Sequence, residues 1–210
     1  MYRLYYAPGA ASLAAHWMLI DLGVPHELRK LDLGAGEHKD PEYMRLNPNG
    51  LVPTLVVDDR PVYECAAILM LLAERHPQAQ LEPARGTAGR MAYLQWMMHL
   101  TNTLQTAFRG WFYPHEAAGE AAAPRVKEFA RSLIESAWNR VEAQLAASGG
   151  HIAGPQLTAA DFLATMLMRW SRNMPRPATD WPTIRGYVER MKARPSFRTL
   201  YEREGLTEWA

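Results

Sequence analysis

The chain has 210 residues, enough for one large domain or two small ones. Hydrophobic residues make up 48% and charged residues 21%, which is typical of a globular protein, and a formal net charge of +1 gives no field that would favour nucleic acid or an anionic membrane as a partner. The single cysteine, Cys65, excludes an intramolecular disulfide and favours a reducing, cytoplasmic location.

The first elements predict a β-α-β unit. Tyr2 to Tyr6 alternates between two faces, as a strand does, and the N-terminus lacks the basic segment and long apolar core of a secretory signal. Ser12 stands where the N-cap of a helix is expected, and apolar residues at helical spacing follow it to about Leu22. His26 to Leu31 predicts a second strand, joined to the first as a parallel pair by a right-handed crossover.

The next elements complete an α/β unit over residues 1–77, with the order βαβ–α–ββα. A short helix is predicted near Pro41 to Leu46. Strands at 55–57 and 61–63 predict an antiparallel hairpin, and Glu64 to Arg75 predicts a helix. The apolar run from Cys65 to Ala73 is far too short to span a membrane and suits a buried helix.

Pro53 lies at the point where the third strand should begin, directly after the turn sequence NPNG at 47–50. It removes an N–H donor and makes a cis peptide bond accessible. One interpretation is a turn that leads into an edge strand. The other is that a cis Val52–Pro53 bond leaves the Val52 main chain unpaired, for a peptide-like ligand to bind. This stretch by itself favours the first.

The rest of the chain predicts a linker at 78–86 and an all-α helical bundle at 87–210. Helical periodicity covers 91–108, 124–147, 158–172 and 183–193, with a short further segment from Ser196. Thr158 and Asp161 predict a capping box, which is a structural feature. The seven histidines show no metal-ligand spacing and no Gly-rich nucleotide loop is present, so we expect no metal and no nucleotide cofactor.

Taken together, these elements resemble a cytosolic glutathione S-transferase, with a thioredoxin-like N-terminal domain and a helical C-terminal domain. The resemblance covers nearly the whole chain, and its most specific pieces are GEHKDPEYMRLNPNGLVPTL and YECAAILMLLAERHP. It implies a homodimeric detoxification enzyme that conjugates the glutathione thiolate to small hydrophobic electrophiles. Glutathione would be a co-substrate, with no other cofactor.

The resemblance also implies a glutathione site beside a cis proline. Val52 would pair in antiparallel fashion with the cysteinyl backbone of the ligand, and Pro53 would be cis so that this backbone stays free. The implied glutathione-binding residues are His38, Lys39, Val52, Pro53, Glu64 and Cys65.

Four of these residues also have ordinary structural interpretations. Glu64 would accept from the γ-glutamyl ammonium, but an acid here also suits the helix dipole. The N–H of Cys65 would hold the γ-glutamyl carboxylate, but the side chain also suits a small buried position, and the family usually has a serine here, a better donor than a thiol. His38 and Lys39 would reach the glycine carboxylate, or form a solvated loop.

The reaction needs a thiolate, and a free thiol with a pKa near 8.5 is only about 3% ionised at pH 7. Lowering that pKa by about two units corresponds to about 2.7 kcal/mol. Ser12 is the first candidate to donate a hydrogen bond to the sulfur, although an N-cap role explains its position equally well. Tyr6, at the end of the first strand, is the second candidate, although packing between sheet and helices explains it better.

Two departures set this chain apart from the beta-like bacterial members that it most resembles. Their loop reads P-G-A-C-S, and here Ala11 stands in place of the cysteine. They often carry L-H-x-x-F on the first long helix, and here Gln105 follows Leu104. Both changes remove groups linked to mixed-disulfide chemistry and favour a transferase that uses Ser12.

The stretch FRGWFYPH at 108–115 is the expected electrophile site, with Arg109, Trp111 and Tyr113 lining it, although a dimer contact or core packing explains it almost as well. Trp209 is a candidate lid. Two alternative functions remain open. One is a non-catalytic glutathione-binding, ligand-binding or regulatory protein, which Ala11 and Cys65 make credible. The other is a glutathione-dependent isomerase or dehalogenase.

Overall fold

The computed structural model describes residues 1–209 and divides into two compact units. The first unit comprises residues 1–82 together with the chain from Met191 on, and the second comprises Pro83–Arg190. This division differs from the expected boundary, which assigned all of 87–210 to the helical domain. The difference arises because the last helix packs on the first helix of the chain.

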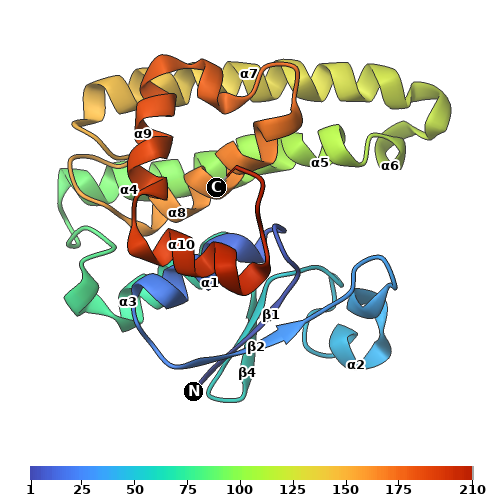
Figure 1. The fold of residues 1–210 in the computed structure, drawn as a ribbon, viewed down its shortest axis with the longest axis horizontal. Coiled ribbons are helices and arrows are strands. Elements are labelled where there is room, and N and C mark those ends of the chain that lie inside the picture. Colours follow the sequence, from blue (N-terminus) through green and yellow to red (C-terminus); the bar gives the residue numbers. More distant parts are fainter. Residues whose placement is uncertain (210) are drawn as a thin grey trace. The chain divides into compact units, whose positions relative to one another are not determined.

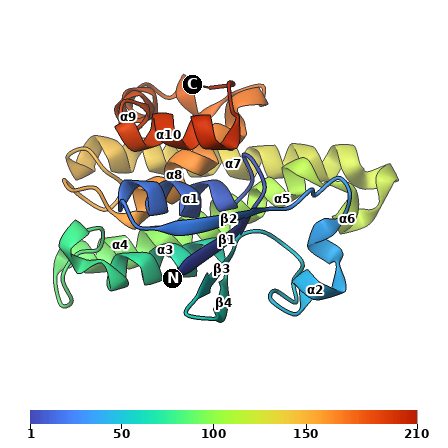
Figure 2. The same ribbon diagram turned by 60° about the horizontal axis from the view of Figure 1, so that its bottom comes forward.

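A four-stranded sheet forms the centre of the first unit (Figure 2), in the order β2-β1-β3-β4. The strands are β1 (Tyr2–Tyr6), β2 (His26–Lys30), β3 (Thr54–Val57) and β4 (Arg60–Tyr63). β1 and β2 are parallel, and the other two pairs are antiparallel, with Tyr5 opposite Thr54 and Thr54 opposite Tyr63. This register brings the end of β1, the start of β3 and the end of β4 to the same end of the sheet.

Helices cover both faces of this sheet because successive side chains of a strand point to opposite faces. On β1, the Tyr6 ring lies 5.5 Å from His16 of α1 (Ser12–Asp21), between ring centroids. The adjacent Tyr5 ring lies 5.5 Å from Tyr43 of α2 (Pro41–Met44), on the other face. The short 3₁₀ helix η1 (Glu37–Lys39) precedes α2, and α3 (Cys65–Arg75) follows β4 and packs beside α1.

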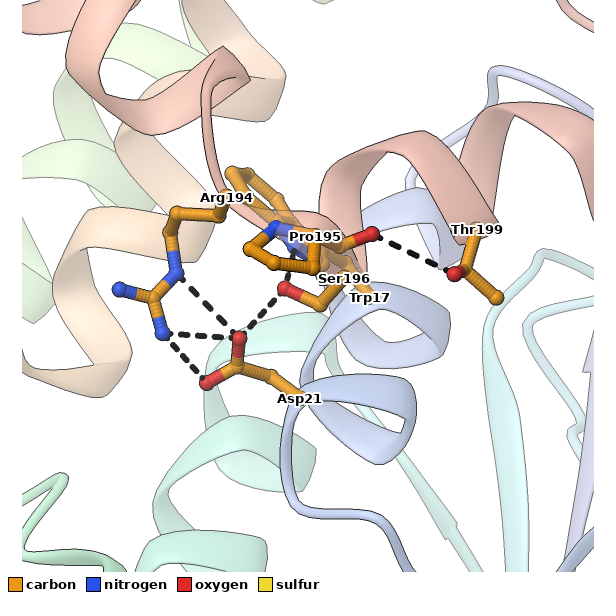
Figure 3. A network of polar contacts seen from close by, with 6 residues as sticks. All are labelled: Trp17, Asp21, Arg194, Pro195, Ser196 and Thr199. Atoms are coloured by element: carbon orange, nitrogen blue, oxygen red, sulfur yellow. Dashed lines mark hydrogen bonds and ion pairs between the residues drawn. The ribbon is translucent and has the colours of Figure 1, made fainter.

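The last helix, α10 (Pro195–Glu204), packs on α1 through apolar contacts and through a network of polar contacts, which Figure 3 shows. The Trp17 ring meets Phe197 at 5.1 Å, and the Trp17 indole N–H donates to the Ser196 hydroxyl at 2.9 Å. Asp21, at the end of α1, accepts from that hydroxyl and forms an ion pair with Arg194 at 2.9 Å. These contacts assign the C-terminal segment to the first unit.

One expected feature of α1 is wrong: Ser12 is not its N-cap. Ala11 occupies that position, and Ser12 is the first helical residue. The Ser12 hydroxyl turns back along the chain, where it donates to the Ala7 carbonyl at 3.1 Å and accepts the Ala7 N–H at 3.2 Å. It therefore fixes the loop between strand and helix in place of capping the helix.

The second unit is helical, as expected. Its longer segments are α4 (Ala88–His99), η3 (Leu100–Gln105), α5 (Thr106–Phe112), α6 (His115–Ala118), α7 (Ala123–Ser148) and α8 (Ala159–Trp170), and α9 (Pro182–Lys192) begins within it. The expected helix over 91–108 contains a π-helical segment, η3, which the periodicity did not indicate. α5 and α7 lie side by side (Figure 1), and a Cβ at Gly110 would lie only 3.1 Å from the Ala130 Cβ.

The capping box predicted at the start of α8 is present. The Asp161 carboxylate accepts the Thr158 N–H at 2.7 Å and also the Tyr187 hydroxyl at 2.9 Å. Burial raises the pKa of Asp161, and the donors around it oppose that rise. Within residues 1–209, no helix is both long and apolar enough to cross a membrane.

Candidate active site

A buried polar cluster, formed by Tyr43, Asn47 and Thr54, fixes the turn that precedes β3. The Leu51 carbonyl accepts the Tyr43 hydroxyl at 2.6 Å and the Asn47 side-chain amide at 2.8 Å. The Thr54 hydroxyl lies 2.7 Å from the Tyr43 hydroxyl and accepts from Asn47 at 3.2 Å. Burial raises the pKa of Tyr43, which keeps its hydroxyl a donor. The cluster therefore holds the residue immediately before Val52.

Val52 presents its main chain without a partner. The Val52–Pro53 peptide bond is cis. Among residues 1–209, no hydrogen bond is made to the Val52 N–H or to its carbonyl oxygen, and the residue is partly exposed. A donor and an acceptor on one residue, at the end of a sheet, match an extended peptide ligand.

The start of α3 lies at the same end of the sheet, because β4 ends there. Glu64 is exposed and is the N-cap of α3, with φ 72° and ψ 112°, a conformation that non-glycine residues rarely adopt. Such strained residues are concentrated at functional sites. The Cys65 N–H follows at the first helical position, where helix geometry leaves it free to bind an anion.

The Cys65 side chain has a structural role. Its thiol is buried and donates to the Ala11 carbonyl at 3.2 Å, which joins the start of α3 to the start of α1. Burial raises the pKa of Cys65 to about 12, and the nearby Glu64 charge adds to the effect. The thiol therefore stays protonated.

Side chains from α1, α3 and α10 contact the loop 7–11. The Ser12 hydroxyl binds Ala7, the Cys65 thiol binds the Ala11 carbonyl, and the Glu204 carboxylate accepts the Gly9 N–H at 2.8 Å. Within the loop, the Ala10 N–H donates to the Ala7 carbonyl at 3.1 Å. In the described part of the chain, the N–H groups of Ala11 and Ser12 have no acceptor. They are thus two free donors at the positive end of a ten-residue helix. The fully buried Ser12 hydroxyl has already donated its hydrogen to Ala7.

Tyr6 is largely buried on the α1 face of the sheet, against His16. Burial raises the pKa of Tyr6, and the Glu204 carboxylate adds to the rise. This environment favours the packing interpretation of Tyr6.

Lys39 and His38 lie beside the same turn. The Lys39 ammonium is exposed and donates to the Asn49 carbonyl at 3.3 Å, three residues before Val52. His38 is half-buried, and its buried Nδ1 atom has no hydrogen-bond partner among residues 1–209. The first unit therefore brings together, around one end of its sheet, the strand and loop positions expected to bind glutathione.

The residues expected to bind the electrophile form a cluster of their own in the second unit. Arg109 makes two hydrogen bonds of 2.6 Å to Glu116 and lies 4.4 Å from the centre of the Tyr113 ring. The Trp111 ring is covered by the Lys127 ammonium at 4.5 Å. Trp209, the candidate lid, packs in the first unit against Phe197, at 6.4 Å between ring centroids.

Three elements of this site were not expected from the sequence. The sequence predicts Tyr43 only as part of a short helix and Asn47 only as part of a turn. Glu204 gave no signal, because it is 195 residues from the Gly9 N–H that it binds.

No grouping of three or more side chains suited to metal binding occurs within residues 1–209.

Comparison with known proteins assigns both halves of the chain to the same protein family. The profile of the glutathione S-transferase N-terminal domain matches residues 10–75, and that of the glutathione S-transferase C-terminal domain matches residues 102–202. Glutathione S-transferase GST-4.5 of Xanthomonas campestris pv. campestris is 31% identical over 97% of this chain and 99% of its own length. Glutathione S-transferase GstA of Escherichia coli O157:H7 is 30% identical over the same shares.

Solved structures agree with this assignment. A glutathione transferase from Methylococcus capsulatus str. Bath superposes with a TM-score of 0.87 at 32% identity, covering 99% of this chain and 100% of that one. A sphingomonad glutathione S-transferase complexed with glutathione gives 0.85 at 27% identity, covering 98% and 100%. With the fold, the free Val52 main chain and these full-length relatives in agreement, the chain belongs to the glutathione S-transferase family.

Proposed function

We propose that the protein is a glutathione S-transferase that conjugates the glutathione thiolate to small hydrophobic electrophiles. The observation that carries the proposal is the unpartnered Val52 main chain, which lies at the end of the sheet where α1 and α3 also begin. This arrangement offers a peptide-pairing edge and two helix N-termini to one small anionic peptide. The relatives named glutathione S-transferase support the same activity.

Glutathione has a binding group for each of its parts. The Val52 N–H and carbonyl pair with the cysteinyl main chain. The exposed Glu64 carboxylate accepts from the γ-glutamyl ammonium, and the Cys65 N–H holds the adjacent carboxylate. Lys39, with His38 beside it, binds the glycine carboxylate at the other end.

The thiolate is held by the start of α1. Because the Ser12 hydroxyl hydrogen is donated to Ala7, we propose that Ser12 acts through its main-chain N–H, together with that of Ala11, while its hydroxyl fixes the loop. A hydrogen bond to a charged acceptor contributes about 1.5–3 kcal/mol and a helix terminus about 0.3–1 kcal/mol. Together they are sufficient for a thiol pKa lowered by about two units, which corresponds to about 2.7 kcal/mol. Tyr6 is the alternative donor.

Binding is tested by titrating glutathione into the wild type and into Val52→Pro, which deletes the Val52 N–H. Loss of one main-chain hydrogen bond of about 1 kcal/mol predicts affinity at least about fivefold weaker. Leu51→Ala is the matched control, because it keeps every main-chain donor and its side chain is exposed. Equal glutathione affinity in all three proteins would contradict the main-chain pairing. If the wild type does not bind glutathione, the whole proposal is wrong.

Chemistry is tested by turnover of a chromogenic aryl halide. Ser12→Ala is expected to lower turnover and thermal stability together, because Ala7 loses both of its side-chain hydrogen bonds. Tyr6→Phe is expected to leave turnover unchanged. Full activity in Ser12→Ala with a loss in Tyr6→Phe would transfer the donor role to Tyr6. Glutathione binding without turnover of any electrophile would favour a non-catalytic binding protein, and turnover confined to isomerisable or haloalkane substrates would favour an isomerase or dehalogenase.

The electrophile site is proposed at the end of α5, where Trp111 and Tyr113 provide an aromatic surface. The Arg109 guanidinium lies over Tyr113 and the Lys127 ammonium over Trp111. Trp111→Ala is expected to raise KM for the aryl halide without changing glutathione affinity. Unchanged kinetics in this variant would place the electrophile elsewhere.

A homodimer is part of the proposal. Large apolar side chains of the second unit are exposed, with Phe129 at 65% and Leu133 at 41%. Both line a shallow groove of about 320 Å³ between α5 and α7, whose lining is mainly apolar. Phe129→Asp is expected to shift the sedimentation of the protein from dimer to monomer, and a wild-type monomer would contradict this assignment.

A cytoplasmic location completes the proposal, because the only cysteine is a free thiol.

A further inference from the structure

A buried carboxylate of the last helix reaches the loop that begins α1. The Glu204 and His16 side chains are both fully buried, and Glu204 Oε1 lies 2.8 Å from His16 Nδ1. The other oxygen, Oε2, accepts the Gly9 N–H at 2.8 Å. Burying a carboxylate is costly unless its oxygens are hydrogen-bonded, and here each oxygen has a donor.

The His16 ring shows which group donates in this pair. His16 Nε2 is buried and has no hydrogen-bond partner in the described chain. A buried N–H without an acceptor is more costly than a vacant lone pair, so the proton is assigned to Nδ1 and is donated to Glu204. Around this pair, His16 contacts the rings of Tyr6 at 5.5 Å and His26 at 5.8 Å, and His26 Nε2 is 3.2 Å from the Arg203 guanidinium.

Gly9 is the part of the loop that needs an external restraint. Its φ of 69° belongs to the left-handed region, which glycine enters readily and also leaves readily. The Ser12 hydroxyl holds Ala7, and the Cys65 thiol holds Ala11. Glu204 adds a side-chain restraint at Gly9, between these two points, next to the main-chain bond from the Ala10 N–H to the Ala7 carbonyl.

We propose that Glu204 is a positioning residue for thiolate stabilisation, which acts on bound glutathione through the Gly9 main chain and not through its own charge. This inference rests on the proposed function, because it concerns the same N–H groups. It couples the C-terminal helix to the chemistry near the N-terminus of the chain.

The test is the pKa of the glutathione thiol bound to the enzyme, measured from the ultraviolet absorbance of the thiolate as pH is raised. Glu204→Ala is expected to raise that pKa by about one unit, a tenfold loss of thiolate relative to thiol. Glu204→Gln keeps an oxygen for the Gly9 N–H and is expected to stay within about threefold of the wild-type ratio. Glu202→Ala, an exposed residue of the same helix, is the matched control and is expected to change nothing.

The possible outcomes distinguish three effects of Glu204: on the position of the Gly9 main chain, on the thiol through its charge, and on the stability of the protein. If Glu204 acted through its charge, both Glu204→Ala and Glu204→Gln would lower the bound thiol pKa, since removing a negative charge favours a thiolate. That result would overturn the inference, as would an unchanged pKa in Glu204→Ala with only the melting temperature reduced. If Glu204→Ala does not fold, Glu204→Asp, which is too short to hold both Gly9 and His16, is expected to show the raised pKa. Failure of the wild type to bind glutathione would remove the proposed function as well, and the titrations with Val52→Pro detect that case separately.

Discussion

Asn47→Ala tests whether the buried polar cluster fixes the glutathione-binding main chain. Asn47 is 2% exposed, and its side chain makes three hydrogen bonds: it donates to the Leu51 carbonyl and the Thr54 hydroxyl, and accepts from the Asn49 N–H at 3.1 Å. At about 1 kcal/mol for each bond, complete loss would cost about 3 kcal/mol. Because Tyr43 still contacts both Leu51 and Thr54, we expect a loss of about 2 kcal/mol in the free energy of unfolding.

The same change should weaken glutathione binding, because the residue before Val52 loses one of its two donors. A cost of about 1 kcal/mol in ordering this turn corresponds to affinity about fivefold lower. Chemical denaturation measures the first effect and calorimetric titration the second, with Asn49→Ala as control, since Asn49 is the exposed asparagine of the same turn.

A double-mutant cycle sharpens this test. Tyr43→Phe removes the other donor to the Leu51 carbonyl, so the double variant should cost more than the sum of the two single changes. The reasoning is refuted if Asn47→Ala unfolds within about 0.5 kcal/mol of the wild type and binds glutathione equally well, because changes of that size are typical of surface sites.

Three further changes test other parts of the structure. The pKa of Cys65 is raised to about 12 in the folded state from an ordinary 9.0, so stability that is present below pH 9 should be lost between pH 9 and 12. Denaturation at stepped pH should show a steeper loss above pH 9 for the wild type than for Cys65→Ser, and parallel curves would contradict the burial of this thiol. Gly50→Ala should destabilise by about 2 kcal/mol or more, because φ is 55° and a Cβ would lie 2.9 Å from the His38 carbonyl and 2.8 Å from the Lys39 ammonium. It should also weaken glutathione binding. Gly36→Ala, with φ 81° and no atom of the described residues within 4 Å of the added Cβ, should show only the backbone cost in the same assays. Asp161→Ala should cost about 3 kcal/mol or more by denaturation, since the Ile152 N–H, the Thr158 N–H and the Tyr187 hydroxyl lose a buried acceptor; a cost below about 1 kcal/mol would show that water replaces it.

Local patterns were sufficient to predict most of the fold. The alternation of Tyr2 to Tyr6, the strand pair around the turn at 58–59 and the capping box of Thr158 and Asp161 depend on neighbours within a few residues, and each is present in the structure. The π-helical segment 100–105 was not predictable, because its residues have no pattern that distinguishes them from a continuous α-helix.

The site was predictable where its groups belong to the main chain and less so where they are side chains. The positions of Val52, Glu64 and Cys65 follow from strand and helix boundaries, whereas their roles toward glutathione are implied by the resemblance and stay proposals. The direction of a hydroxyl or thiol is decided by distant acceptors, and the Ser12 hydroxyl on Ala7 and the Cys65 thiol on Ala11 could not be inferred from spacing. The partnership of Gly9 with Glu204 depends entirely on tertiary packing.

The grouping of residues 1–82 with the chain from Met191 on has a consequence for biosynthesis. A ribosome releases the sheet and its first helices early, yet the segment that covers α1 emerges last, after all of the second unit. Until then, Trp17 lacks Phe197 and Asp21 lacks Arg194. The nascent first unit therefore carries an uncovered aromatic surface for most of translation, and a chain cut short before α10 should be a preferred substrate for chaperones and proteases.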